Sequence, residues 1–370
     1  MVSATPSHQN SGDLQLAEAN DSTVIIDSNI ADTNRWDALM NWNLMTIPYT
    51  GYTPETSWQF GTTGVYYFKT ANSPLYSDVN FNLGYYLDTQ WNVDVNSRIH
   101  FNSDLQWYLD LYLSAKNSND TFFGVGDEIN ADGYAYHTNL IDIQAKPNFY
   151  ITDKILITPT LRIHYEDAFN TNSADSETLN SVTGFGDICF IGIGAAVTYD
   201  TRSNFYYPNS GIFAKINATY NQPLITNGSN SMLINGDFRQ YIPIYNDFIF
   251  AWNFYTEFSF GNDIPFQLMP TIGGQDILRG VRRYLYRNDY VYSLQGELRI
   301  PIWRFLKATA YAGIGDAYSY DQTTWQMPKV GYGVGLRACI HQSKTNIRFD
   351  IARQNYDNNW SFYFTVKEAF

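Results

Sequence analysis

A period of two in hydrophobicity, repeated along most of the chain, is the feature that most restricts its fold. In one segment six aromatic side chains share a single parity: Phe248, Phe250, Trp252, Phe254, Phe258 and Phe260. Polar side chains such as Asn253 and Glu257 occupy positions between them. Successive side chains of a β-strand point to opposite faces of the sheet. The pattern therefore predicts strands with one aromatic face and one polar face.

The number and length of these segments favour a membrane barrel over a soluble sheet. Fifteen alternating segments occur between residues 57 and 369, and residues 42–52 supply a sixteenth. Most span about 10 residues or more, and a tilted strand crosses a bilayer in about 9 to 11. The prediction is an all-β fold, a transmembrane antiparallel β-barrel of 16 strands with its apolar face toward lipid. A soluble all-β fold is the alternative, but it would leave many aromatic side chains without cover.

Composition narrows the possible functions. Aromatic residues make up 17% of the chain and the net charge is −13. A disordered chain carries few aromatic residues, and a nucleic-acid binder needs a basic face, so neither class fits. The two cysteines and five scattered histidines show no spacing typical of a metal site or a disulfide framework. We therefore expect no cofactor, no metal and no nucleic-acid partner.

The chain divides into two parts. Residues 1–35 are polar and lack a sustained period, which predicts a flexible arm, and residues 36–370 form the predicted barrel. The first ten residues have no basic or apolar region typical of a signal peptide, and no apolar run approaches the length of a transmembrane helix. The sequence thus indicates either a cytosolic chain or a mature form, and the barrel pattern favours the bacterial outer membrane.

Four blocks in the second half of the chain, in a fixed order, resemble one family. They are Tyr199–Asn204 with Pro208–Gly211, then Pro270–Val281, then Gln295–Pro301, and finally Gly333–Arg337 with Arg348–Asp350 and Glu368–Phe370. Together they resemble the BamA/TamA outer-membrane superfamily, also called the bacterial surface antigen family. Known assembly and secretion members carry periplasmic POTRA domains before the barrel. Residues 1–35 do not look like such a module, so the chain resembles the POTRA-less branch.

The resemblance implies a non-enzymatic protein that aids insertion or translocation of proteins or lipids at the outer membrane. It implies contact with outer-membrane lipids and lipopolysaccharide, and with the outer-membrane assembly machinery during biogenesis. Other outer-membrane or periplasmic proteins are further expected partners. Two alternatives remain open. One is a pore or surface-exposed binding barrel that uses the long polar loops 117–132 and 167–187, and the other is a membrane-embedded hydrolase that uses a lumenal histidine such as His164.

The block Pro270–Val281 holds the motif Gly273, Gly274, Arg279 and Gly280 within the long polar loop 262–287. Glycine allows a backbone to turn and to approach a wall closely. We expect this loop to fold into the lumen, where Arg279 would bond a carboxylate because a desolvated guanidinium needs a partner. The motif departs from the family at Val281, which replaces an aromatic residue, and at Gly313, where many relatives carry the inward aspartate.

Parity on the neighbouring strands supplies candidate partners for the loop. Leu298 and Ile300 point outward in the predicted barrel, so Glu297 and Arg299 point into the lumen, and Arg348 and Asp350 do the same on a later strand. Glu297 and Asp350 are the leading candidates to bind Arg279. The alternative is that all of these are ordinary solvated charges of a polar lumen.

The last segment resembles the signal by which the assembly machinery recognises its clients. Alternate positions are apolar or aromatic and the series ends on phenylalanine: Trp360, Phe362, Phe364, Val366 and Phe370. Glu368 departs from the series, since another apolar residue is common there. A last strand that closes the barrel is a compatible interpretation.

Overall fold

The computed structural model describes most of the chain from residue 43 onward. The described residues are 43–370 without 54–56, 71–72, 74–75, 88, 102–106, 127–128, 171–174, 205–206, 226–227, 304, 322–326, 340–345, 357–359 and 367. The predicted flexible arm, residues 1–35, lies outside this set.

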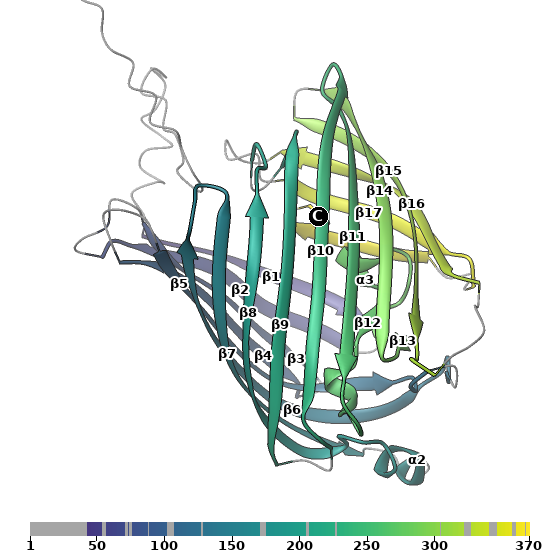
Figure 1. Cartoon of the computed structure of the whole chain (residues 1–370). Coiled ribbons are helices and arrows are strands. Elements are labelled where there is room, and N and C mark those ends of the chain that lie inside the picture. The colour runs from purple at the N-terminus through teal and green to yellow at the C-terminus, as the bar shows by residue number, and fades with distance from the viewer. Residues whose placement is uncertain are drawn as a thin grey trace, which may run out of the picture.

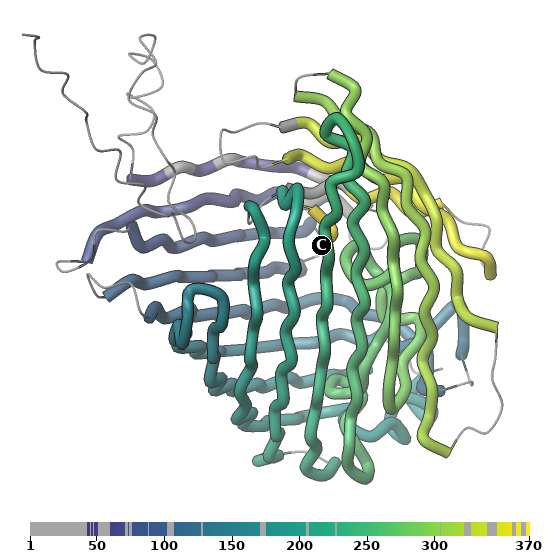
Figure 2. The backbone as a smooth tube through the Cα atoms, turned by 45° about the horizontal axis from the view of Figure 1, so that its top comes forward, coloured from purple at the N-terminus to yellow at the C-terminus, as the bar shows by residue number. Residues whose placement is uncertain are grey.

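One antiparallel sheet of 16 strands forms the molecule, and each strand pairs with its neighbours in chain order. Its strands are β1 (Leu44–Thr53), β2 (Ser57–Phe68), β3 (Ser77–Tyr86), β4 (Trp91–His100), β5 (Trp107–Phe122), β6 (Tyr134–Tyr150), β7 (Ile155–Asn170), β8 (Gly186–Asp200), β9 (Gly211–Ile225), β10 (Ser231–Tyr245), β11 (Phe248–Phe260), β14 (Tyr290–Trp303), β15 (Leu306–Tyr318), β16 (Lys329–Cys339), β17 (Asn346–Gln354) and β18 (Trp360–Val366). Figures 1 and 2 show them wrapped around a lumen. The predicted sixteen-stranded barrel is confirmed.

The two faces of the sheet differ as the period of two predicts. Large apolar side chains such as Ile193, Ile216 and Val334 are exposed on the outer face. Charged and amide side chains such as Glu297 and Asp350 are buried on the inner face. This reverses the arrangement of a soluble protein and is the arrangement of a barrel whose outer face meets lipid.

Several strands extend beyond the limits that hydrophobicity set for them. β5 continues to Phe122 and β7 to Asn170, so the connections after them are shorter than the predicted loops 117–132 and 167–187. Most of the extra residues are polar, and Asn117–Asp120 pair in register with Tyr136–Asn139 of β6. Backbone hydrogen bonds require no apolar side chain, so a ladder can continue where alternation has ended.

The connection between β11 and β14 folds against the inside of the wall. It contains η1 (Phe266–Leu268), β12 (Thr271–Ile272), α3 (Gly274–Ile277) and β13 (Tyr286–Arg287), and β12 pairs with β13. Ile272, Leu278 and Val281 of this loop pack with Val291 of β14 in a buried cluster. Figure 1 shows α3 and β12 behind the strands β11 and β14. A small apolar core thus attaches the loop to the wall.

The helices of the described residues are few and short. The loop between β7 and β8 carries α2 (Ser176–Asn180), whose Leu179 is fully buried. Within the part of the chain that the structure describes, no helix has both the length and the apolar character needed to span a membrane.

Candidate functional site

The glycines of the loop motif hold backbone conformations that other residues rarely adopt. Gly273, Gly274 and Gly280 all have positive φ, and that of Gly280 is 97°. A Cβ on Gly280 would lie 2.6 Å from the carbonyl oxygen of Arg353, and one on Gly273 would lie 2.5 Å from that of Arg282. The loop therefore passes Arg353 of β17 too closely for any side chain at position 280.

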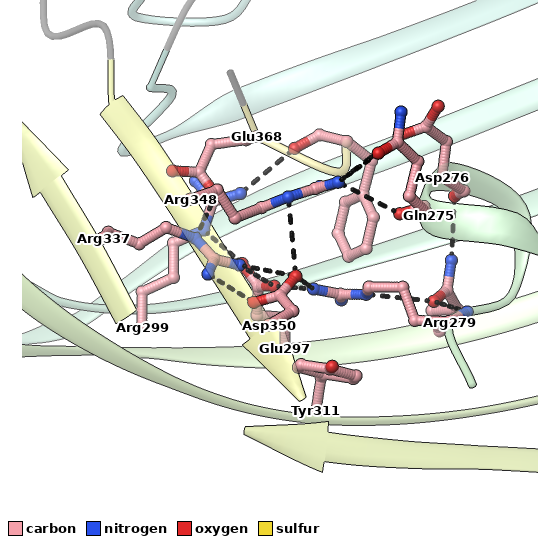
Figure 3. Close-up of polar contacts among 12 residues, drawn as sticks. Gln275, Asp276, Arg279, Glu297, Arg299, Tyr311, Arg337, Arg348, Asp350 and Glu368 are labelled. Carbon is pink, nitrogen blue, oxygen red and sulfur yellow. Dashed lines mark hydrogen bonds and ion pairs between the residues drawn. The ribbon is translucent and has the colours of Figure 1, made fainter. Parts of the chain in front are cut away.

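The residue before Gly280 in this turn is Arg279. Its side chain is fully buried, and its Nη1 lies 2.6 Å from Oε2 of Glu297 and 3.3 Å from Oδ2 of Asp350 (Figure 3). The guanidinium carbon lies 3.6 Å from the ring centroid of Tyr311, and the backbone N–H of Arg279 donates to Oε1 of Gln295. One side chain thus contacts strands β14, β15 and β17.

Glu297 and Asp350 each form ion pairs with more than one arginine. Glu297 Oε1 accepts from Arg299 at 2.8 Å, and its Oε2 lies 3.3 Å from Arg337. Asp350 Oδ1 accepts from Arg337 at 2.5 Å. Charge-assisted hydrogen bonds of this kind are strong, and a network in which each carboxylate has several donors offsets much of the cost of desolvation.

The other two candidate partners have separate roles. Arg348 faces the loop helix α3, where its Nη2 lies 3.5 Å from Gln275 Oε1 and 3.8 Å from the carboxylate of Asp276. Asp276 itself is exposed, so its contact with Arg348 is weakened by water. Arg299 makes no described hydrogen bond to the loop motif itself.

Arg299 instead joins two distant segments of the chain. Its Nη1 donates to the carbonyl oxygen of Pro208 in the β8–β9 turn, and its Nη2 donates to that of Phe370, both at 3.1 Å. Tyr207 lies under the same guanidinium. The turn and the last residues of the chain therefore meet inside the wall at Arg299.

Past β18 the chain turns into the lumen. Glu368 accepts from Arg337 at 2.7 Å and from Asn346 at 2.8 Å, and Phe370 is buried with Tyr207 and Tyr241. Trp360 and Phe362 remain exposed on the outer face. The side chains of Phe364 and Val366 lie outside the described residues. The apolar series predicted as an assembly signal is thus divided between two faces.

Two charged residues of this network, Arg337 and Glu368, were not among the predicted site residues. Arg337 shares the inward parity of Gly333 and Gly335, opposite Val334 and Leu336, so alternation alone could have identified it. Glu368 carried no such signal, because its position in the alternating series predicts an outward side chain.

His164, the residue considered for a hydrolase, lies between two carboxylates. Its Nδ1 is 2.8 Å from Oδ2 of Asp142 and its Nε2 is 3.3 Å from Oε2 of Glu166. The hydroxyl of Thr138 donates to Glu166 rather than to the imidazole. In a serine-type site one imidazole nitrogen must face the nucleophile, and the described contacts of His164 leave that position to a carboxylate.

Comparison with known proteins gives a family match and a fold match. The Omp85 superfamily domain matches residues 73–370. No curated protein matches the chain significantly. Among solved structures, BamA from Haemophilus ducreyi lacking POTRA domains 1–3 is similar at 12% identity with a TM-score of 0.62, covering 88% of this chain and 70% of that one.

Two CdiB structures are similar to a lesser degree. CdiB from Acinetobacter baumannii has 11% identity and a TM-score of 0.56, and the match covers 87% of this chain and 59% of that one. CdiB from Escherichia coli has 12% identity and a TM-score of 0.55, with 88% and 62% covered. This chain therefore spans less than two thirds of either CdiB, and the likeness is one of fold. The domain match, which extends over most of the chain and all four sequence blocks, shows that this protein belongs to the Omp85 superfamily.

Proposed function

We propose that this protein is a non-enzymatic barrel of the bacterial outer membrane that aids insertion or translocation of proteins or lipids. The observation that carries the proposal is the burial of Arg279 among Glu297, Asp350 and Tyr311. A loop attached in this way occupies the lumen, which argues against an open diffusion pore. Membership of the superfamily supports the outer-membrane location and the kind of activity.

The absence of catalysis belongs to the same proposal. Its support is the geometry of His164, whose two nitrogens face Asp142 and Glu166. The proposed partners are outer-membrane lipids and lipopolysaccharide around the aromatic face, the assembly machinery that folds the barrel, and the proteins or lipids that the barrel moves.

A second candidate, a pore or surface-exposed binding barrel, is favoured by the opposite wall. There the ion pairs Arg98–Asp110 and Lys116–Asp120 retain about a third of their side-chain exposure, as solvated lumen charges do. This side of the lumen is wetter than the side against which the loop packs.

Reconstitution tests the proposal directly. Liposomes with and without the purified protein would receive a urea-unfolded outer-membrane barrel, and its folding would be followed by altered mobility on unheated gels. We expect the wild-type protein to accelerate folding of the client and Arg279→Ala to lose that acceleration, while Arg283→Ala, an exposed arginine of the same loop, retains it. Equal client folding with and without the protein, together with free passage of small solutes, would favour the pore instead.

A further inference from the structure

A cavity of about 780 Å³ lies at the long-loop end of the barrel, apart from the Arg279 network. Three connections line it. Phe122 and Val125 come from the end of β5 and the residues after it, Val182 follows α2, and Phe266 and Met269 belong to the first part of the lumen loop. This volume lies in the range of sites that hold small organic molecules.

Hydrogen bonds between the three connections hold the cavity open. Gly126 N–H donates to the carbonyl oxygen of Arg287 at 2.8 Å, and Phe266 N–H donates to that of Thr183 at 3.0 Å. The rings of Phe122 and Phe266 pack edge to face, with their centroids 5.2 Å apart. A ligand would therefore enter a preformed site rather than order three loops on binding.

The lining combines apolar surface with unpaired negative charge. Phe122, Tyr134 and Phe266 contribute aromatic rings, and Asp263 and Asp289 contribute carboxylates, and none of the described lining residues is a lysine, arginine or histidine. The guanidinium of Arg287 lies over the rings of Phe122 and Phe266. Asp289 Oδ2 accepts from the hydroxyl of Ser319 at 2.9 Å and from Tyr320 N–H at 3.1 Å, which fixes its carboxylate. Among described residues neither aspartate forms an ion pair.

We propose that this cavity binds small organic cations in which an ammonium group is attached to an apolar body. The two carboxylates would pair with the ammonium, and the aromatic rings would contact the apolar body. A bare metal ion fits less well, because the described residues contain no group of three His, Cys, Asp or Glu placed to coordinate one. The proposal is independent of the insertion activity.

Fluorine NMR can test it with a defined probe. The full chain in uncharged maltoside detergent would be titrated with para-fluorophenethylamine, and in parallel with para-fluorophenylacetate, which has the same ring and the opposite charge. We expect saturable binding of the amine and none of the acid. Asp263→Asn with Asp289→Asn should weaken binding about tenfold, roughly the effect of losing one good charge interaction. Asp132→Asn, at an exposed loop position outside the lining, should leave the affinity unchanged.

Two outcomes would overturn the proposal. One is equal binding of amine and acid, which would indicate partition into detergent. The other is an affinity that stays unchanged in the double aspartate variant, or in a folded Val182→Trp, which fills the cavity. Because Val182 packs against a buried cluster, Val182→Trp counts only if it folds, whereas Asp263 is exposed and its variant tests the site regardless. Client folding in liposomes should be the same in the double variant and in wild type, which separates this proposal from the proposed function.

Discussion

Arg279 is fully buried, and it has several interaction partners. Its guanidinium has Glu297 and Asp350 at its edge and Tyr311 against its face. Transfer of an arginine from water is costly unless such partners are already in place, and here the strands β14, β15 and β17 hold them rigidly. The side chain therefore ties the loop to three strands at once.

Removing the guanidinium should be strongly destabilising, because Glu297 and Asp350 would lose a donor while remaining buried. We expect Arg279→Ala to lower stability by about 3 to 5 kcal/mol, the usual cost of breaking a buried ion pair. The measurement is the temperature at which half of the detergent-solubilised protein loses its folded mobility on gels. Arg279→Lys should recover only part of the loss, since an ammonium cannot reproduce the planar fork or stack on Tyr311 in the same way.

Arg283→Ala is the matched control for this experiment. Arg283 lies on the same loop, is exposed and contacts the ring of Tyr284. Its loss should change the unfolding temperature little, because exposed charge interactions contribute about 0 to 1 kcal/mol. Equal destabilisation by both alanine variants would show that burial of Arg279 contributes nothing special.

Gly280 and Gly186 separate backbone strain from steric contact. Both have positive φ, at 97° and 96°, but a Cβ on Gly186 would meet no atom within 4 Å, whereas one on Gly280 would meet Arg353. Gly186→Ala should cost about 1 to 2 kcal/mol from conformation alone. Gly280→Ala should cost clearly more in the same heat-mobility measurement, because the loop must also move away from β17. Equal costs would contradict the close approach.

How much of this site could be predicted differs from residue to residue. The side chains of Glu297 and Asp350 could be placed inward because regular strands fix parity, and the motif identified Arg279 as the residue to bring near them. Which partner each inward arginine would contact could not be predicted. Arg299 and Arg348 have the same inward parity, yet one reaches Phe370 and the other reaches Gln275, because parity fixes the face of a side chain and not the segment that comes to lie opposite it.

At the scale of elements, the end of β18 shows where alternation ceases to predict structure. In the sequence the apolar series continues to Phe370, but the strand ends at Val366 and the chain turns inward. An alternating pattern specifies faces only while the backbone remains in the sheet. Here the buried contacts of Glu368 with Arg337 and of Phe370 with Tyr207 and Tyr241 determine the path.

Phe370 and Phe362 should therefore behave differently. Phe370 is buried, so Phe370→Ala should leave a void and lower the unfolding temperature of the folded barrel, by up to about 3 kcal/mol in stability. Phe362 is exposed on the outer face, and Phe362→Ala should change the unfolding temperature little in detergent. If the two residues act only as an assembly signal, both variants would reach the membrane poorly and neither would alter the heat stability of the molecules that do fold.

At the scale of the whole molecule, the lumen has two unlike halves. The loop between β11 and β14 packs against the later strands, where four arginines are fully buried: Arg279, Arg299, Arg337 and Arg348. The earlier strands present charges such as Arg98 and Asp110 that remain partly exposed. Parity in the sequence predicts a polar lumen. It does not predict this asymmetry, because the asymmetry depends on which side of the lumen the β11–β14 loop packs against.

This asymmetry predicts an order of conductance in planar bilayers. The wild-type barrel should conduct least, since the loop packs against the inside of its wall. Arg279→Ala should conduct more and fluctuate, because the loop keeps its apolar contacts through Ile272, Leu278 and Val281 but loses its ionic anchor. Replacing residues 264–285 with a short Gly-Ser link should give the largest and steadiest conductance. Equal conductance of all three proteins would mean that the current passes elsewhere, and would refute the loop as the principal barrier in the lumen.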